Sequence, residues 1–154
     1  MTNDRLRWVL PVPFLILAIG AWLISKVEND VAVQVARAQL QQREGYYSQA
    51  LNLHEAIHEN YSRSQFADDV LWEIANIYYV NLYDIDRALL YFHRLVREYP
   101  ESVLAIDAYL KMAEIHEVER RDLPQAIGLL TQALTYGTSF ETDRLIFLEW
   151  EIRI

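Results

Sequence analysis

The chain has 154 residues, an apolar fraction of 53% and a formal net charge of −8 at neutral pH, which bounds it to one domain with a short extra segment. Residues 1–26 carry a net charge of +2, which leaves −10 for residues 27–154, and so acidic a segment argues against a nucleic acid as partner. The absence of cysteine excludes disulfides, cysteine-type zinc sites and covalent haem attachment.

The first predicted element is the apolar run Trp8–Ser25, WVLPVPFLILAIGAWLIS, which contains no ionisable residue. Its 18 positions would form a helix of roughly 27 Å, at the short end of what spans a bilayer. Trp8 and Trp22 lie near its two ends, where indole rings favour the membrane interface. The run predicts a transmembrane anchor, with a cleaved signal peptide as the alternative because Ala18–Gly20 resembles a small-residue cleavage site.

Basic residues around this run predict its orientation. Two arginines precede the run, whereas Lys26 behind it is followed at once by Glu28 and Asp30. Because basic residues tend to stay on the cytoplasmic side, we expect residues 1–26 to form a cytoplasmic tip and a single-pass anchor. Residues 27–154 would then form a separate domain on the opposite side of the membrane.

The connection between the two parts contains no helix breaker. No proline occurs between Phe14 and Arg43, and Gly20 is the only glycine in that stretch. We therefore expect one continuous helix that leaves the anchor and becomes the first helix of the following domain. Such a helix would hold that domain rigidly, unlike a flexible linker.

Beyond residue 30 the sequence has no strand signal but contains an internal repeat. Apolar residues follow helical spacing, without alternating β-branched runs or Asn-Gly and Asp-Gly turns. Ala50, Ala88 and Ala126 recur in similar settings at a constant offset of 38. The same offset relates seven further pairs of identical residues: Ser64 and Ser102, Ala67 and Ala105, Asp69 and Asp107, Ala75 and Ala113, Ile77 and Ile115, Val80 and Val118, and Asp84 and Asp122. The pattern predicts an all-α domain of repeated antiparallel helix pairs.

Residues suited to helix ends recur with the same period. Ser64 and Ser102 are suited to be N-caps of one helix of each pair. Asp84 and Asp122 are suited to the same role for the other helix, and Gly45 falls where a helix is expected to stop. The caps therefore predict the same two-helix unit as the alanines.

The middle unit carries six residues at a known spacing of large aromatic, small or aliphatic, tyrosine, alanine, aromatic and proline: Trp72, Ala75, Tyr79, Ala88, Phe92 and Pro100. This stretch resembles a tetratricopeptide (TPR) repeat and departs from it at Asn76, where Gly or Ala is usual, and at Leu95, where Ala is usual. The flanking units match more weakly, through Ala113, Ala126 and Ala133 on one side and Ala38 and Ala50 on the other. The resemblance implies a TPR-like α-solenoid of about three helix pairs plus a terminal helix within residues 27–154.

The length of the unit indicates which group of TPR proteins the sequence resembles. The period exceeds the usual TPR length of about 34 by roughly one helical turn, and such lengthened units with YPES before a long helix resemble TPR proteins of bacterial envelopes. This implies a non-enzymatic adaptor or scaffold, without a cofactor, that binds proteins in an envelope complex. It would sit in the bacterial inner membrane with its N-terminus cytoplasmic and its repeats in the periplasm. The alternative is a small accessory subunit of a respiratory, photosynthetic or secretion assembly.

The pentapeptide HEAIH, which begins at His54, matches the H-E-x-x-H pattern of zinc peptidases. In that pattern two histidines on one helix face hold Zn²⁺ and the glutamate activates a water. In the repeat, however, His54 takes the position of Phe92 and Leu130, which points it into the packing between helices. Glu73 is the only candidate third ligand, and no strand is predicted to hold a substrate. We expect His54 and His58 to be packing residues, and a zinc-dependent peptidase is the less favoured alternative.

The family register also predicts a protein-binding groove, because the first helices of a TPR solenoid line its concave face. The groove residues in this sequence would be Gln39, Gln42, Arg43, Glu73, Ile77, Val80, Asn81, Lys111, Ile115, Val118 and Glu119. The aliphatic members suit an extended peptide or an amphipathic helix, and the charged members would set its orientation. The alternative is that the aliphatic residues pack between adjacent repeats.

The last stretch, residues 141–154 with the sequence ETDRLIFLEWEIRI, is expected in the first-helix position of a fourth unit. No second helix follows in this sequence to cover its apolar residues, which are Ile146, Phe147, Trp150 and Ile154. Because terminal repeats usually have a polar outer face, we expect a partner or further chain to cover these residues.

Overall fold

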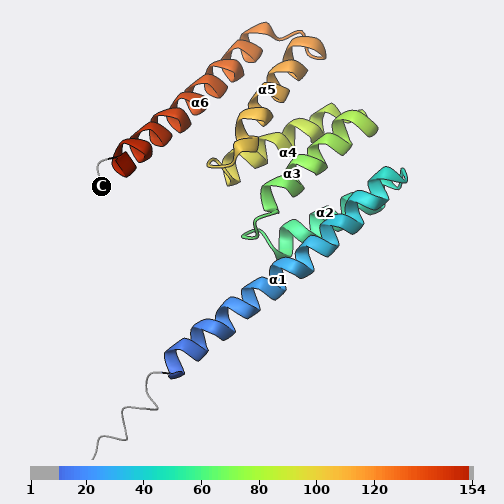
Figure 1. Cartoon of the computed structure of the whole chain (residues 1–154). Coiled ribbons are helices and arrows are strands. Elements are labelled where there is room, and N and C mark those ends of the chain that lie inside the picture. Colours follow the sequence, from blue (N-terminus) through green and yellow to red (C-terminus); the bar gives the residue numbers. More distant parts are fainter. Residues whose placement is uncertain (1–10, 153–154) are drawn as a thin grey trace, which may run out of the picture.

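The computed structural model describes the backbone of residues 11–152 and the side chains of residues 14–137. Every element in this part is helical: α1 (Pro11–Arg43), α2 (Tyr47–Asn60), α3 (Ala67–Asn76), η1 (Ile77–Asn81), α4 (Ile85–Glu98), α5 (Val103–Val118) and α6 (Leu123–Ile152). The π-helical segment η1 directly continues α3. Helix α1 packs against α2, α3 against α4, and α5 against α6, and the pairs follow one another in Figure 1. The expected all-α architecture of helix pairs is confirmed.

The sequence period is visible in the backbone at the turn inside each pair. Gly45, Tyr83 and Arg121, which are equivalent positions of the three units, have positive φ angles of 83°, 54° and 53°. The residue that follows is an N-cap in two of the units. The Asp84 carboxylate accepts a hydrogen bond of 3.0 Å from the backbone N–H of Arg87. The Asp122 carboxylate accepts one of 3.2 Å from Gln125. A left-handed residue before the second helix therefore shapes every hairpin, and the two aspartates are N-caps as predicted.

The turn between units repeats as well. The Ser102 hydroxyl accepts a hydrogen bond of 3.0 Å from the backbone N–H of Leu104 and caps α5, as predicted. The Ser64 hydroxyl accepts one of 3.3 Å from Phe66. Regular helix nevertheless starts only at Ala67, and the N-cap of α3 is Phe66. The prediction of Ser64 as that N-cap was wrong because its hydrogen bond closes a turn that precedes the helix.

The core is built where the small residues let the helices approach. Ala50, Ala88 and Ala126 have exposed fractions of 0%, 0% and 3%, as their shared position predicts. Larger side chains fill the space beside them, and the rings of Trp72 and Phe92 meet edge to face at 5.3 Å between centroids. Aromatic pairs in this geometry contribute about 0.5–1.5 kcal/mol beyond the area that they bury. The repeated alanine thus marks the closest contact of each pair.

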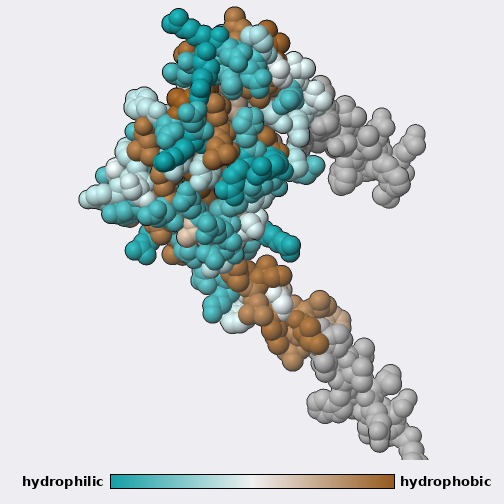
Figure 2. Space-filling model, turned by 180° about the vertical axis from the view of Figure 1, so that it is seen from behind, coloured by the Kyte–Doolittle hydropathy of each residue, from teal (hydrophilic) through white to brown (hydrophobic). Residues whose placement is uncertain are grey.

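Helix α1 is continuous over 33 residues, as the absence of helix breakers predicted. Its first half projects from the repeats, and the apolar surface on this projection is brown in Figure 2. Phe14, Leu17 and Trp22 have exposed fractions of 71%, 69% and 62%. Within residues 11–152, none of the helices combines the length and apolarity that crossing a membrane requires, so the predicted transmembrane helix is not found. Trp8, at the start of the predicted span, lies outside the described residues.

Helix α6 corrects the expectation of a fourth unit. It runs without interruption over 30 residues, so residues 141–152 continue the second helix of the third unit instead of starting a new one. The only glycine near the expected turn, Gly137, lies within this helix, and among the described residues no positive φ angle occurs beyond Arg121. Side chains beyond residue 137, including the apolar ones named above, lie outside the described residues.

Replacing Gly45 by alanine tests the role of the left-handed turn. A Cβ atom at this position would meet no atom within 4 Å, so the cost comes from the backbone alone. Because an L-residue with a side chain in this conformation costs about 1–2 kcal/mol, Gly45→Ala should lower the free energy of unfolding by about 1 kcal/mol. Urea denaturation followed by circular dichroism measures this change. Gly128→Ala is the control: the glycine is helical and equally open, and alanine there should stabilise by about 0.5–1 kcal/mol.

Candidate functional site

A recess of about 320 Å³ lies between the second and third units, where the sequence predicted part of the groove. It is lined by Tyr79, Val80, Tyr83, Ile85 and Glu119. The first two belong to η1, the next two to the turn and start of α4, and Glu119 follows α5. Two of the predicted groove residues, Val80 and Glu119, therefore line the same recess.

The π-helical segment shapes one wall of this recess. Its wider turn closes with a hydrogen bond of 3.0 Å from the backbone N–H of Leu82 to the carbonyl of Ile77. The same type of turn occurs one period later, from Arg120 to Ile115 at 3.2 Å. A π-type turn bulges the backbone outward, and such bulges are frequent at functional sites. Val80 and Tyr83 accordingly have exposed fractions of 56% and 81% beside the recess.

The charges at the rim are mixed. The Lys111 Nζ atom lies 6.0 Å from the centroid of the Tyr79 ring and 2.7 Å from Glu114 Oε2. Burial, followed by the nearby carboxylates of Glu114 and Glu119, raises the pKa of Tyr79, so its hydroxyl stays neutral at physiological pH. The recess therefore offers apolar and aromatic surface with one cation and two carboxylates around it.

The burial of Ile77 and Ile115 contradicts their predicted position in the groove. Both have exposed fractions of 0% and lie in the core, so for these two the alternative of packing between adjacent repeats is the right one. The two isoleucines are identical because they have the same core position in two units. Val80 and Val118 also follow the repeat, but their exposed fractions are 56% and 61%.

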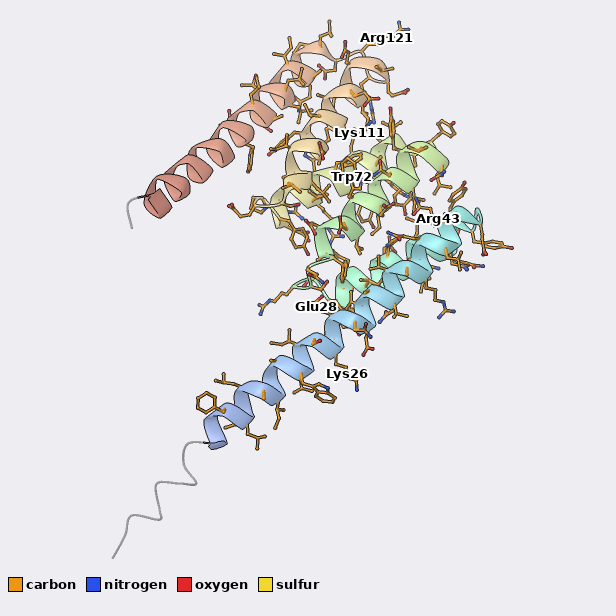
Figure 3. The ribbon with its side chains drawn as sticks, viewed as in Figure 1. Lys26, Glu28, Arg43, Trp72, Lys111 and Arg121 are labelled. Atoms are coloured by element: carbon orange, nitrogen blue, oxygen red, sulfur yellow. The ribbon has the colours of Figure 1, made fainter. Side chains whose placement is uncertain are left out.

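The other predicted groove residues lie at the surface but are not all together. Glu73, Asn81 and Lys111 are partly exposed on the first helices of the second and third units. Gln39, Gln42 and Arg43 lie on α1 and line no part of the recess. Figure 3 shows Arg43 at the end of α1 and Lys111 on α5. Tyr79, Tyr83 and Ile85 were missed, although the glycine at the position of Tyr83 in the first unit was a usable signal of an outward turn.

The histidines of the HEAIH pentapeptide form a different arrangement at the contact between α2 and α4. His54 has an exposed fraction of 0%, and neither ring nitrogen has a hydrogen-bond partner among the described residues. Burial lowers its pKa to about 4. Phe92, at the same position of the next unit, is equally buried, which confirms the packing role predicted for His54.

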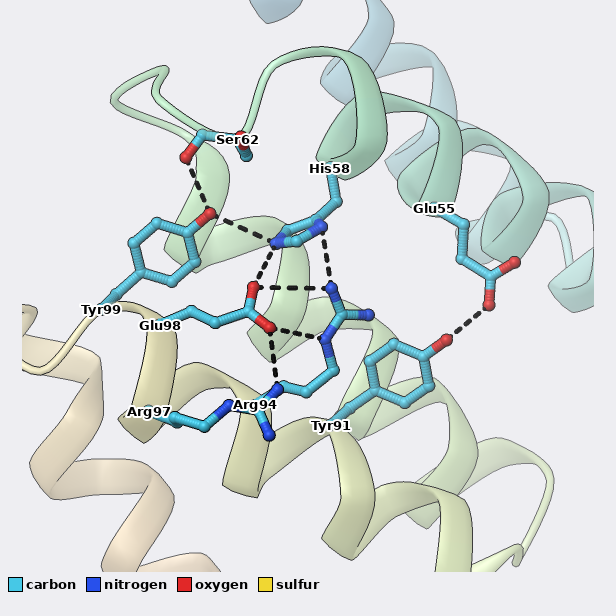
Figure 4. A network of polar contacts seen from close by, with 8 residues as sticks. All are labelled: Glu55, His58, Ser62, Tyr91, Arg94, Arg97, Glu98 and Tyr99. Carbon is cyan, nitrogen blue, oxygen red and sulfur yellow. Dashed lines mark hydrogen bonds and ion pairs between the residues drawn. The ribbon is translucent and has the colours of Figure 1, made fainter.

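His58 lies in a polar network that Figure 4 shows in detail. Its Nδ1 atom is 3.2 Å from Arg94 Nη2, and its Nε2 atom is 3.1 Å from Glu98 Oε2 and 3.2 Å from the Tyr99 hydroxyl. A guanidinium only donates hydrogen bonds, so Nδ1 must accept and the proton of the neutral ring must be on Nε2. Burial and the charge of Arg94 lower the pKa of His58, against the opposing effect of Glu98. The network therefore holds a neutral imidazole between the two helices.

Glu55, the glutamate of the pentapeptide, also contacts α4. The Tyr91 hydroxyl donates a hydrogen bond of 2.7 Å to Glu55 Oε1, and burial together with this bond raises the pKa of Tyr91. Within the part of the chain whose side chains are described, no three metal-ligating side chains gather, and Glu73, the candidate third ligand of the less favoured zinc site, does not join the histidines. Glu55 and His58 thus contact the next unit, whereas His54 is buried without a hydrogen-bond partner among the described residues.

The comparison with known families agrees with this geometry. Residues 69–102 match the tetratricopeptide repeat family, over the unit whose residues resembled it most. No curated protein matches the chain. The protein therefore contains a TPR repeat within an all-helical arrangement, and repeats of this kind typically bind protein partners.

Replacing His54 by leucine tests the cost of its unpartnered imidazole. Leu130 has this position in the third unit, and a buried polar group without a partner costs about 1–3 kcal/mol, so His54→Leu should raise stability at pH 7 by a similar amount. Urea denaturation at pH 7 measures this. Asn52→Leu, on the exposed surface of α2, is the control and should change stability by less than about 0.5 kcal/mol. A less stable His54→Leu variant would show that the imidazole has a favourable role.

The same variant has a defined pH dependence. The pKa of His54 is about 4 in the folded protein, below the ordinary value of 6.5, so the unfolded chain binds more protons between these pH values. Above pH 6.5 the ring is neutral in both states and adds no proton-linked cost, whereas between pH 6.5 and 4 the free energy of unfolding falls by roughly 3 kcal/mol in total because only the unfolded chain takes up the proton. His54→Leu should therefore lose less stability than the wild type between pH 7 and pH 4.5.

Proposed function

We propose that this protein is a non-enzymatic adaptor that binds a segment of a partner protein in the recess between its second and third units. The recess itself supports this proposal most directly. It brings two predicted groove residues, Val80 and Glu119, together with exposed aromatic surface. The TPR repeat at residues 69–102 supports a protein as the ligand.

The chemistry of the recess defines the ligand. Val80 and Tyr83 offer exposed apolar surface for aliphatic or aromatic side chains. Glu114 and Glu119 lie at the rim, and residues 27–154 carry a net charge of −10. A negative domain attracts positively charged segments and accelerates their association. The ligand is therefore an extended or helical segment with apolar residues and at least one lysine or arginine.

We further propose that the projecting half of α1 anchors the repeats in the bacterial inner membrane, with the repeats in the periplasm. A helix that is apolar on all sides is stable only when it is buried in protein or lipid. Leu15, Ile16 and Leu17 have exposed fractions of 60%, 64% and 69%, and as consecutive residues they point in different directions around α1. The described part of the apolar run covers positions 11–25, and the rest of the predicted span precedes it in the sequence.

The end of the proposed anchor has features of a membrane interface. Lys26 Nζ lies 5.7 Å from the centroid of the Trp22 ring, and both residue types favour the lipid headgroup layer. A recess of about 420 Å³ separates this part of α1 from the turn at residues 60–64, which contains Tyr61 and Arg63. The same apolar surface of α1 also suits contact with other membrane helices, which favours an accessory subunit of a larger membrane assembly as the second candidate function.

Site-specific photo-crosslinking in cells tests the recess. A photoreactive phenylalanine analogue in place of Tyr83 should crosslink a partner protein, because this side chain is exposed at the edge of the recess. Adding Val80→Glu should reduce the adduct at least about tenfold, since a buried carboxylate opposes apolar contact. The analogue in place of Leu90, which is 57% exposed on α4, is the control. The same adducts from both positions, unaffected by Val80→Glu, would refute binding in the recess.

Charged substitutions test the anchor. Each arginine near the middle of a membrane helix costs about 2.5–3.5 kcal/mol, so the Ile16→Arg/Leu17→Arg variant should move from the membrane pellet to the supernatant after alkaline extraction. Leu90→Arg, which adds a similar charge to the exposed surface of the repeats, should leave the protein in the pellet. Extraction of the wild-type protein into the supernatant would contradict the anchor.

A further inference from the structure

The outer face of α6 carries an apolar stripe that no described residue covers. Leu123, Ile127, Leu130 and Leu134 have exposed fractions of 56%, 62%, 42% and 71%. Their spacing of four, three and four residues places them along one side of the helix. The other side, with Ala126, Leu129 and Ala133, is buried against α5. The stripe is therefore a second apolar face that α5 does not use.

The repeat shows what covers this face in the other units. One period earlier, Phe92 and Val96 of α4 have exposed fractions of 0% and 8%, and the following first helix, α5, packs against α4. Two periods earlier, Leu51, His54 and His58 of α2 have exposed fractions of 7%, 0% and 6%. Helix α3 packs against α2, and α4 adds the polar contacts to His58 described above. In both cases the first helix of the next unit follows. The stripe on α6 is thus the place where another first helix would dock.

The opposite end of the solenoid has the complementary feature. Val33 and Leu40 of α1 have exposed fractions of 63% and 52%, and Ala36 between them is exposed. Their counterparts in α3 and η1, which follow another unit, are buried: Leu71 at 0%, Ile74 at 0% and Tyr78 at 7%. The counterparts in α5, Tyr109 and Met112, are buried at 8% and 0%, and His116 is partly buried. Among the described residues, α1 is the first helix without a preceding unit.

We propose that copies of this protein stack head to tail, with the α6 stripe of one copy on the Val33–Leu40 face of α1 in the next. In the other units the first helix of the next unit packs on this face, and among the described helices α1 is the first helix whose docking face is uncovered. The contact would repeat the register of α2 with α3 and of α4 with α5. A contact between two α6 stripes would instead leave the α1 face exposed. Because the two faces differ, the association is heterologous and extends the solenoid from copy to copy, as an open row or a closed ring according to the rotation between copies.

The internal repeat also identifies residues that would meet across this contact. Arg120, just after α5, forms an ion pair with Asp86 of α4. His116 lies one turn before Arg120, and His93 lies two turns after Asp86 on the same side of α4. Burial, followed by the charge of His116, lowers the pKa of His93, which agrees with this proximity. Shifting His93 forward by one period gives Thr131, and shifting His116 back by two periods gives Leu40. Thr131 of one copy should therefore lie beside Leu40 of the next.

Cysteine crosslinking tests this geometry cleanly because the chain has no cysteine. Full-length Leu40→Cys and Thr131→Cys chains with different tags are mixed in detergent and oxidised. Head-to-tail stacking predicts a disulfide between the two tagged chains, and little product from either chain alone. Leu40→Cys mixed with Leu90→Cys, whose leucine lies on the surface of α4, supplies the background.

A second substitution tests the stripe itself. Adding Ile127→Glu to the Thr131→Cys chain should reduce the mixed disulfide at least about tenfold, whereas adding Leu90→Glu should leave it unchanged. Both residues are exposed in the single chain, so circular dichroism should show the same helix content for the two variants. A disulfide-linked dimer formed by the Thr131→Cys chain alone would mean that two α6 stripes meet. A mixed disulfide at background level would mean that something other than a second copy covers the stripe. Either result overturns the proposal.

Discussion

The left-handed residue at the end of each first helix is the constraint on which the rest of this structure depends. Gly45, Tyr83 and Arg121 turn the chain at the same point of three units, and their positive φ angles orient each second helix against the first. Only the first unit meets this demand with glycine, so the other two accept the strain of a side chain in this conformation. Once the turn is set, the buried alanines and the side chains around them have fixed positions relative to it.

The contact between the first two units departs from this uniform packing. Where the second unit has Phe92 and Val96, the first has His54 and His58. Arg94, Glu98 and Tyr99 enclose His58 and hold it neutral, while His54 is buried without a partner among the described residues. Such a contact is sensitive to the protonation of its two rings.

Much of the fold could be predicted because the repeat superimposes independent signals. Identical residues at one offset, capping aspartates and a TPR-like unit all indicated the same helix pair, and the backbone follows it. The phase also assigned His54 to the core in spite of its zinc-peptidase pattern. Ile77 and Val80 show the limit of this reasoning, because both recur one period later but only the valines are exposed. Repeated spacing indicates equivalent environments, and it does not reveal whether an environment is core or surface.

Features that depend on local backbone detail could not be predicted. The π-helical segment at Ile77–Asn81 decides which side chains line the recess, and no residue in this stretch has a known preference for it. The continuation of α6 through Gly137 was missed for a related reason, since a glycine in a helix costs only about 1 kcal/mol and does not end it. The network around His58 could not be predicted because it depends on how α2 and α4 are placed relative to each other, and these helices lie far apart in sequence.

The unbroken course of α1 has a mechanical consequence. The helix has no kink-forming residue between its projecting half and the part that packs on α2, so the two halves act as one rod. A tilt imposed on the exposed half by its surroundings would swing the first unit through the same angle. Because the hydrogen-bonded turns join each unit to the next, that rotation would be carried along the row of hairpins. The rod can thus work as a lever that converts the inclination of its base into displacement at the far end.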